Sequence, residues 1–147
     1  MTTIKRTALL PYSAEQLFEL VNDVESYTCY MDGCVGAQVL HRDDAVIEAR
    51  LELARGGIRQ SFTTRNRSLD YQAIELELLE GPFETFRGRW QFQKLGDMAC
   101  KVSLDLQFTF NNSLLGAAAG KLFDAVTANL VDALSRRARD VLSVHDQ

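Results

Sequence analysis

The side chains that most often carry out chemistry, cysteine and histidine, are few and widely spaced in this chain of 147 residues. Cys29 and Cys34 have four residues between them, whereas zinc and redox sites usually have two. The third thiol, Cys100, is remote in sequence, and the two histidines, His41 and His145, are far from each other. This spacing predicts unreactive thiols and no metal site.

No motif of a known catalytic site is present in the sequence. A nucleophile elbow, a phosphate-binding loop, an H-E-x-x-H segment and a paired histidine are all absent. The adjacent carboxylates Asp43 and Asp44 stand in a predicted turn, where acidic residues are common. We therefore expect no catalytic residues and a protein that is not an enzyme.

Composition limits the compartment and the classes of partner. The net charge is −4, which is opposite in sign to that of proteins that coat nucleic acid, so DNA is not expected as a partner. The chain begins without an apolar signal core and contains no run of about 20 apolar residues that could span a membrane. We expect one domain over residues 1–147, located in the cytoplasm.

Residues 111–142 form the only long stretch with a helical hydrophobic period. Residues 111–113 suit a helix N-cap, and Arg136, Arg137 and Arg139 suit the negative end of the helix dipole. The apolar stripe consists of Leu115, Leu122, Val126, Leu130, Leu134, Ala138 and Val141. Such a stripe must be buried, so the preceding part of the chain is expected to wrap along this helix.

Two short helices are predicted after a first strand. The strand spans residues 3–10 and stops at Pro11. Ser13 and Gln16 form a capping box, in which each residue satisfies a backbone N–H of the other at the start of a helix. A second short helix is expected to end at Gly33.

From residue 34 to residue 110 the hydrophobic period is two, as in strands that bury one face. About six such segments are separated by short turns, and Gly56-Gly57 is the strongest hairpin signal among them. Because an antiparallel sheet with one buried face needs an apolar cover, the long helix must lie on it. The predicted fold is α+β, with a curved antiparallel sheet of about seven strands around a long C-terminal helix.

Four motifs along the chain resemble those of one protein family. They are PYSAEQLFELVNDVESY at residues 11–27, GGIRQSFTTRN at 56–66, EGPF at 80–83 and WQF at 90–92. In this order, over nearly the whole chain, they resemble the bacterial and mitochondrial coenzyme Q-binding proteins, whose bacterial members are also named ribosome association toxins. The resemblance implies the START-like helix-grip fold of the polyketide cyclase and lipid transport (SRPBCC) superfamily, in which sheet and helix enclose an apolar cavity.

The resemblance implies a carrier or chaperone that binds ubiquinone or another polyprenyl quinone inside the fold and requires no other cofactor. A packed core is the alternative interpretation of the same apolar residues. The small residues at positions 116–120 are expected to widen the space between helix and sheet. The residues expected to line the cavity are Tyr27, Met31, Ile47, Leu51, Phe62, Leu76, Leu78, Phe86, Trp90, Leu104, Phe108, Ala118, Ala119, Leu122, Phe123 and Val126.

The resemblance also leaves open an interaction protein that binds the large ribosomal subunit and blocks subunit joining. Contact with ribosomal RNA would use the basic residues of the outer sheet face, and transient contact with the inner membrane surface is a further alternative. Cross-strand ion pairs that keep the sheet soluble explain the same alternation of charges. The candidate ribosome contacts are Arg59, Arg65, Arg67, Arg87 and Arg89.

One segment departs from the family pattern. The family usually has two prolines and a tryptophan after the tyrosine at position 27, whereas this chain has Thr-Cys-Tyr-Met-Asp-Gly up to Cys34. In such folds the segment lies near the mouth of the cavity. We therefore expect Tyr30 and Met31 to form an adaptable lid there, and the choice of ligand to differ.

Overall fold

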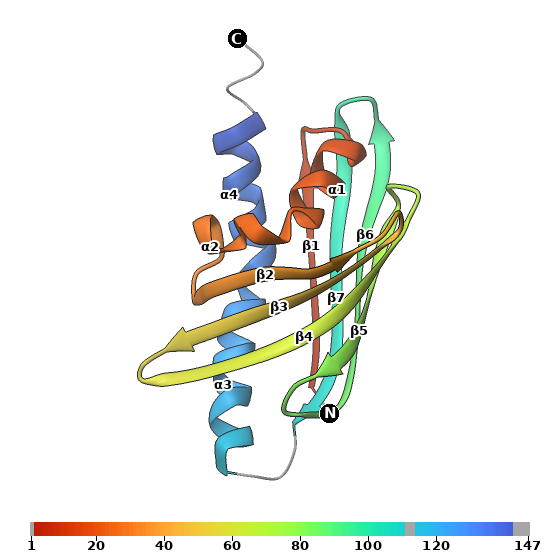
Figure 1. The fold of residues 1–147 in the computed structure, drawn as a ribbon. Helices are drawn as coiled ribbons and strands as arrows, with labels where there is room; N and C mark the ends of the chain where they lie inside the picture. Colours follow the sequence, from red (N-terminus) through yellow and green to blue (C-terminus); the bar gives the residue numbers. More distant parts are fainter. Residues whose placement is uncertain (1, 111–113, 143–147) are drawn as a thin grey trace.

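In a computed structural model of the chain, residues 2–110 and 114–142 are described, without the side chains of residues 114–119. Seven antiparallel strands form one sheet in the order β1-β7-β6-β5-β4-β3-β2. Figure 1 shows this sheet curving around a column of two helices, with β2, β3 and β4 crossing over the column. The arrangement confirms the predicted α+β helix-grip fold.

The elements follow one another in the predicted order. The strands are β1 (Thr2–Leu10), β2 (Cys34–Arg42), β3 (Val46–Arg55), β4 (Ile58–Leu69), β5 (Ala73–Glu80), β6 (Phe83–Gly96) and β7 (Ala99–Phe110). The helices are α1 (Ala14–Asn22), the 3₁₀ turn η1 (Val24–Ser26), α2 (Tyr27–Tyr30), α3 (Leu114–Ala128) and α4 (Leu130–Leu142).

The capping box that starts α1 is present. The backbone N–H of Gln16 donates to the Ser13 hydroxyl over 3.1 Å, and the backbone N–H of Ser13 donates to the Gln16 side-chain oxygen over 3.0 Å. Leu17, Phe18 and Val21 of this helix are buried, and α1 packs against β6, β7 and α4. The cap thus fixes where the helix begins and which of its faces meets the sheet.

The Gly56-Gly57 hairpin sets the register of the two strands that matter most below. Both glycines have positive φ, +59° and +83°, as a tight primed turn requires. Arg55 pairs with Ile58 across this turn, and the ladder continues with regular antiparallel pairing along β3 and β4. Because side chains alternate along a strand, this register decides which residues of β4 face inward.

The predicted long helix is divided in two at Asn129, between α3 and α4. The Asn129 side-chain amide donates to the Ala125 carbonyl over 3.1 Å, and the Thr127 hydroxyl donates to the Phe123 carbonyl over 2.7 Å. Side chains that bond carbonyls one turn back compete with the helical hydrogen bonds and often bend or interrupt a helix. The expected N-cap at residues 111–113 lies outside the described residues.

Candidate functional site

A small internal cavity of about 60 Å³ lies between the inner face of the sheet and α3. Of the residues predicted to line a cavity, those that do so are Tyr27, Met31, Leu51, Phe62, Leu76, Phe86, Trp90, Leu104 and Phe123. Lining residues that the prediction did not include are Thr64, Asn66, Leu106, Thr127 and Leu130. The cavity is therefore mainly apolar, with three polar side chains.

The volume of the cavity limits what it holds in this conformation. Pockets for drug-sized ligands usually have volumes of about 300–1,000 Å³, far above the value of about 60 Å³ found here. The cavity has room for a small group of atoms and not for a polyprenyl tail. Binding of a whole polyprenyl quinone would require the sheet and the helices to move apart.

Aromatic rings fill the space that the small helical residues were expected to leave open. The ring centroids of Phe83, Phe108 and Phe110 lie 5.2, 4.8 and 6.0 Å from that of Phe123 on α3. A Cβ added at Gly120 would lie 3.1 Å from the Phe110 ring. Gly120 thus lets an aromatic ring pack against the helix, and the expectation that it widens the cavity was wrong.

Several residues predicted to line the cavity lie elsewhere. Alternation along a strand predicts which face a residue occupies but not how far along the cavity it lies. Val126 lines a separate hollow, and Ala118 and Ala119 belong to the side chains outside the description. The residues that pack into or against the surrounding core, and do not line the cavity, are Ile47, Leu78, Phe108 and Leu122.

Three buried polar side chains in the cavity wall were missed by the prediction. Thr64, Asn66 and Thr127 are only 6%, 9% and 3% exposed. The Thr64 hydroxyl donates to the Asn66 side-chain oxygen over 2.8 Å. A signal was available, because strict alternation from Phe62 places residues 64 and 66 on the inner face, and Thr127 lies one helical turn after Phe123.

Met31 lies where a lid was expected but is a core residue, because its side chain is only 4% exposed. A second hollow of about 90 Å³ lies beyond it, beside the break at Asn129. Met31 and Leu130 line both this hollow and the internal cavity, so their side chains separate the two. On the outer side, Arg55 and Asp32 form an ion pair of 3.0 Å.

Two tyrosines of α2 near Met31 contact α1 and α4. The Tyr27 hydroxyl donates to the Val21 carbonyl, and the Arg137 guanidinium lies 5.6 Å from the centre of the Tyr30 ring. Burial raises the pKa of both phenols above their ordinary value, and the nearby Arg137 charge partly offsets this for Tyr30. Both hydroxyl groups therefore stay protonated in the folded protein at neutral pH.

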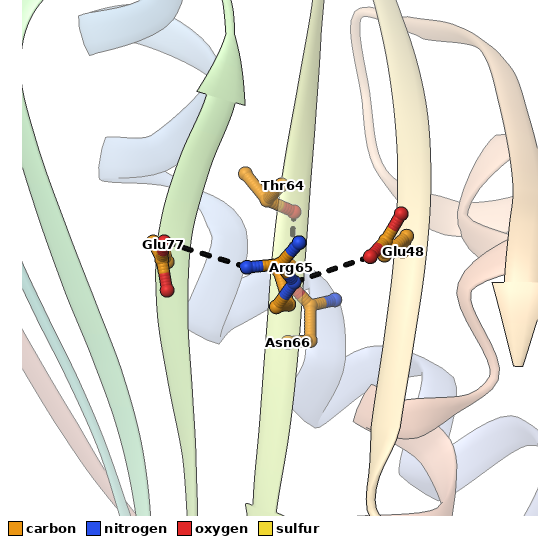
Figure 2. Close-up of polar contacts among 5 residues, drawn as sticks. All are labelled: Glu48, Thr64, Arg65, Asn66 and Glu77. Carbon is orange, nitrogen blue, oxygen red and sulfur yellow. Dashed lines mark hydrogen bonds and ion pairs between the residues drawn. The ribbon is translucent and has the colours of Figure 1, made fainter. Parts of the chain in front are cut away.

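The outer face of the sheet carries two rows of alternating charges. One row runs Glu48, Arg65, Glu77, Arg87 across four strands, and Arg67, Glu75, Arg89 form a parallel row. Arg65 bridges its row, with its guanidinium 3.1 Å from Glu48 and 3.6 Å from Glu77 (Figure 2). This part of the pattern fulfils the expectation of cross-strand ion pairs.

The other predicted basic residues differ in whether they have an acidic partner. Arg59 forms an ion pair of 3.3 Å with Glu52. Arg67, Arg87 and Arg89 are exposed, and within residues 2–110 and 114–142 they form no ion pair. These three arginines, together with Arg65, surround a surface hollow of about 630 Å³ that we call the arginine hollow.

Comparison with known proteins places the chain in a family. The family model described as polyketide cyclase / dehydrase and lipid transport matches residues 10–135. The chain belongs to this family. Solved structures with the same fold include an 18 kDa protein from Caulobacter crescentus, with a TM-score of 0.73, 31% identity and coverage of 97% of this chain and 99% of that one.

Relatives within the polyketide cyclase / dehydrase and lipid transport family carry informative names. The ribosome association toxin RatA of Escherichia coli K12 is 41% identical over 97% of this chain and 90% of its own length. The protein of the same name from Pseudomonas aeruginosa is 43% identical over 95% of this chain and 97% of its own length. These relatives cover nearly the whole domain, so both the cavity and the arginine hollow fall within the shared region.

More distantly similar proteins carry other names. A mitochondrial coenzyme Q-binding protein COQ10 homologue of Xenopus laevis is 23% identical over 88% of this chain and 55% of its own length. The Zhui aromatase/cyclase of Streptomyces sp. R1128 shares the fold with a TM-score of 0.79 at 19% identity, over 95% of each chain.

In the described part of the present chain, no helix is both long and apolar enough to cross a membrane.

Proposed function

We propose that this protein binds the large ribosomal subunit in the cytoplasm through the outer face of its sheet and so blocks subunit joining. It acts as a binding protein and not as an enzyme. The observation that carries the proposal is the arginine hollow, where Arg67, Arg87 and Arg89 form no ion pair among the described residues, although acidic residues lie opposite them on the neighbouring strands. The names of the relatives from E. coli and P. aeruginosa support the same function.

The charge of the arginine hollow differs in sign from that of the whole chain. Four arginines and two glutamates line it, which gives a local net charge of 4 − 2 = +2, whereas the whole chain carries −4. Guanidinium groups bind phosphate oxygens with paired hydrogen bonds, and each such contact releases counterions from the RNA. The rest of the chain carries a net charge of −4 − 2 = −6, which disfavours adhesion of other parts of the protein to RNA.

Co-sedimentation with isolated large subunits tests this proposal. The variant Arg87→Glu with Arg89→Glu reverses two cations of the hollow, whose side chains are exposed and make no ion pair among the described residues. A matched control, Arg136→Glu with Arg139→Glu, makes the same change in net charge on exposed positions of α4. We expect the first variant to lose co-sedimentation and the second to retain it; equal binding by both would exclude the arginine hollow.

A second function, binding of ubiquinone or another polyprenyl quinone as a carrier or chaperone, is favoured by the cavity itself. Its wall is mainly apolar and contains a few polar groups, as ligand pockets usually do. The name of the distant COQ10 relative supports the same ligand class. Because the cavity holds only a small group in this conformation, the quinone tail would enter as Met31 and Leu130 move apart.

Extraction of the purified protein with organic solvent, followed by mass spectrometry, tests the second function. We expect a polyprenyl quinone in stoichiometric amount from protein purified out of its native host. The variant Met31→Leu keeps the side-chain volume at the cavity wall and should therefore retain the lipid. An extract without any quinone, from protein that still binds large subunits, would leave ribosome association as the function of this chain.

A further inference from the structure

We infer that Asn66 and Trp90, supported by Thr64 and Thr127, form a polar subsite in the internal cavity that binds the carbonyl oxygen of a neutral apolar ligand. The inference rests on the second proposed function and adds the chemistry of the ligand head. All four residues line the same cavity. They come from β4, β6 and α3, so the subsite exists only in the assembled fold.

Two hydrogen-bond donors in the cavity wall have no acceptor among residues 2–110 and 114–142. The side-chain NH₂ of Asn66 and the indole N–H of Trp90 donate to no group there, although the two residues are only 9% and 4% exposed. Among the described residues, the fully buried side-chain atoms without a partner are Asp105 Oδ1 and Arg137 Nε, so the Asn66 and Trp90 nitrogens retain some accessible surface. Each of the two donors is therefore available to an acceptor atom that enters the cavity.

The hydroxyl groups of the subsite already use their protons. Thr64 donates to the Asn66 side-chain oxygen over 2.8 Å, and Thr127 donates to the Phe123 carbonyl over 2.7 Å. The first of these bonds holds the Asn66 amide with its oxygen turned to Thr64 and leaves the NH₂ group available. The groups that remain free to form hydrogen bonds are therefore donors, the Asn66 NH₂ and the Trp90 indole N–H. Such donors select a ligand with an acceptor atom.

The ligand head is neutral, because no charged side chain lines the cavity. A carboxylate placed there would lose its hydration without gaining an ion pair, which is strongly unfavourable. A ketone, quinone or ester carbonyl needs no such compensation, and Leu76, Phe86 and Leu104 supply apolar contacts for the carbon atoms next to it. The volume of about 60 Å³ suits a carbonyl group with a few attached carbons.

A pair of small probes of equal shape tests the inference without an identified ligand. Acetone carries the carbonyl, and 2-methylpropene replaces its oxygen with a CH₂ group; both are small, as a cavity of about 60 Å³ requires. Dissociation constants for both are measured with the purified full chain by ligand-observed NMR, and their ratio removes differences in general hydrophobic affinity. We expect Asn66→Leu to reduce the preference for the ketone by about fivefold, the equivalent of one ordinary hydrogen bond.

Matched variants make the test specific. Trp90→Phe removes the indole N–H and keeps an aromatic ring, so it should reduce the preference similarly and also serves if Asn66→Leu fails to fold. Thr63→Val is the control, because Thr63 is buried beside Thr64 but does not line the cavity. For Thr63→Val, the ratio of the dissociation constants of the two probes should equal that of the wild type.

The outcomes separate the inference from the function on which it rests. An unchanged ratio in both Asn66→Leu and Trp90→Phe would overturn the carbonyl subsite while leaving a cavity that binds apolar molecules. Tighter binding of acetate than of acetone would overturn it as well. If the wild type binds neither acetone nor 2-methylpropene, the interior ligand-binding function itself fails, and the subsite fails with it.

Discussion

The Thr64 hydroxyl donates a hydrogen bond of 2.8 Å to the side-chain oxygen of Asn66 on the inner face of β4. Arg65, between them in sequence, carries its guanidinium on the outer face to Glu48 and Glu77 (Figure 2). Of these three consecutive residues, Thr64 and Asn66 line the internal cavity and Arg65 lines the arginine hollow. Because a shift of one residue would exchange the two faces, the register set by the preceding hairpin fixes both sites together.

Replacement of Gly33 by alanine should destabilise the protein by about 2–5 kcal/mol. The φ of Gly33 is +91°, which costs an alanine about 1–2 kcal/mol. The added Cβ would also lie 2.7 Å from Cγ2 of Val126 on α3, and overpacking of this kind costs about 1–3 kcal/mol. Chemical denaturation of the variant and the wild type measures the difference in unfolding free energy.

Gly57→Ala is the matched control for the contact between Gly33 and α3. Gly57 also has a positive φ, +83°, but a Cβ there would meet nothing within 4 Å. Its cost should therefore be limited to the backbone contribution of about 1–2 kcal/mol. Equal losses in the two alanine variants would show that the segment after α2 does not pack tightly against α3.

Met31→Asp should destabilise the fold by several kcal/mol, because the side chain is buried and a carboxylate there would lose its hydration. Met31→Leu keeps the volume and should cost less than about 1.5 kcal/mol. Thermal denaturation followed by circular dichroism compares the two. A Met31→Asp variant as stable as the wild type would mean that this side chain lies in water, as a solvent-facing lid would.

Stability should fall as the pH rises above about 10. Burial is the main cause that raises the pKa of Tyr27 and Tyr30 above the ordinary value of 10.0. In the unfolded chain both phenols lose their protons near that value, whereas in the folded protein they keep them to higher pH. The full stability of the folded protein is therefore present below pH 10, and part of it is lost as the pH rises above 10. Each phenol contributes a slope of up to about 1.4 kcal/mol per pH unit.

Denaturation at several pH values between 8 and about 11.5 measures this dependence. Tyr30→Phe removes one of the two phenols and should flatten the decline. The prediction fails if the wild type and Tyr30→Phe lose stability in parallel over this range.

The fold follows from local patterns that are strong in this sequence. Alternation along residues 34–110, the capping box at Ser13 and the paired glycines at positions 56 and 57 each specify one local structure, and the structure contains all of them. These signals act over a few residues and do not depend on distant contacts. The inward faces of β3, β5, β6 and β7 were predictable for the same reason.

The site was less predictable because its shape depends on contacts between distant residues. Alternation gave no sign that Phe110 fills the space beside Gly120 or that Phe83 packs against Phe110. The break at Asn129 arises from side-chain hydrogen bonds that compete with a pattern otherwise favourable to one long helix. Asn66 was missed because a polar residue on an inner face becomes informative only when its neighbours are known.

The ionic-strength dependence of binding to isolated large ribosomal subunits, measured by sedimentation at fixed magnesium, tests the central claim most directly. If Arg67, Arg87 and Arg89 each contact a phosphate, the logarithm of the binding constant should fall with the logarithm of salt with a slope of about −2 to −3. Between about 50 and 200 mM salt this is a loss of about 15- to 60-fold, and Arg87→Gln should reduce the slope by about 1. A binding constant that does not change with salt, or a slope that Arg87→Gln leaves unaltered, would contradict association through the arginine hollow.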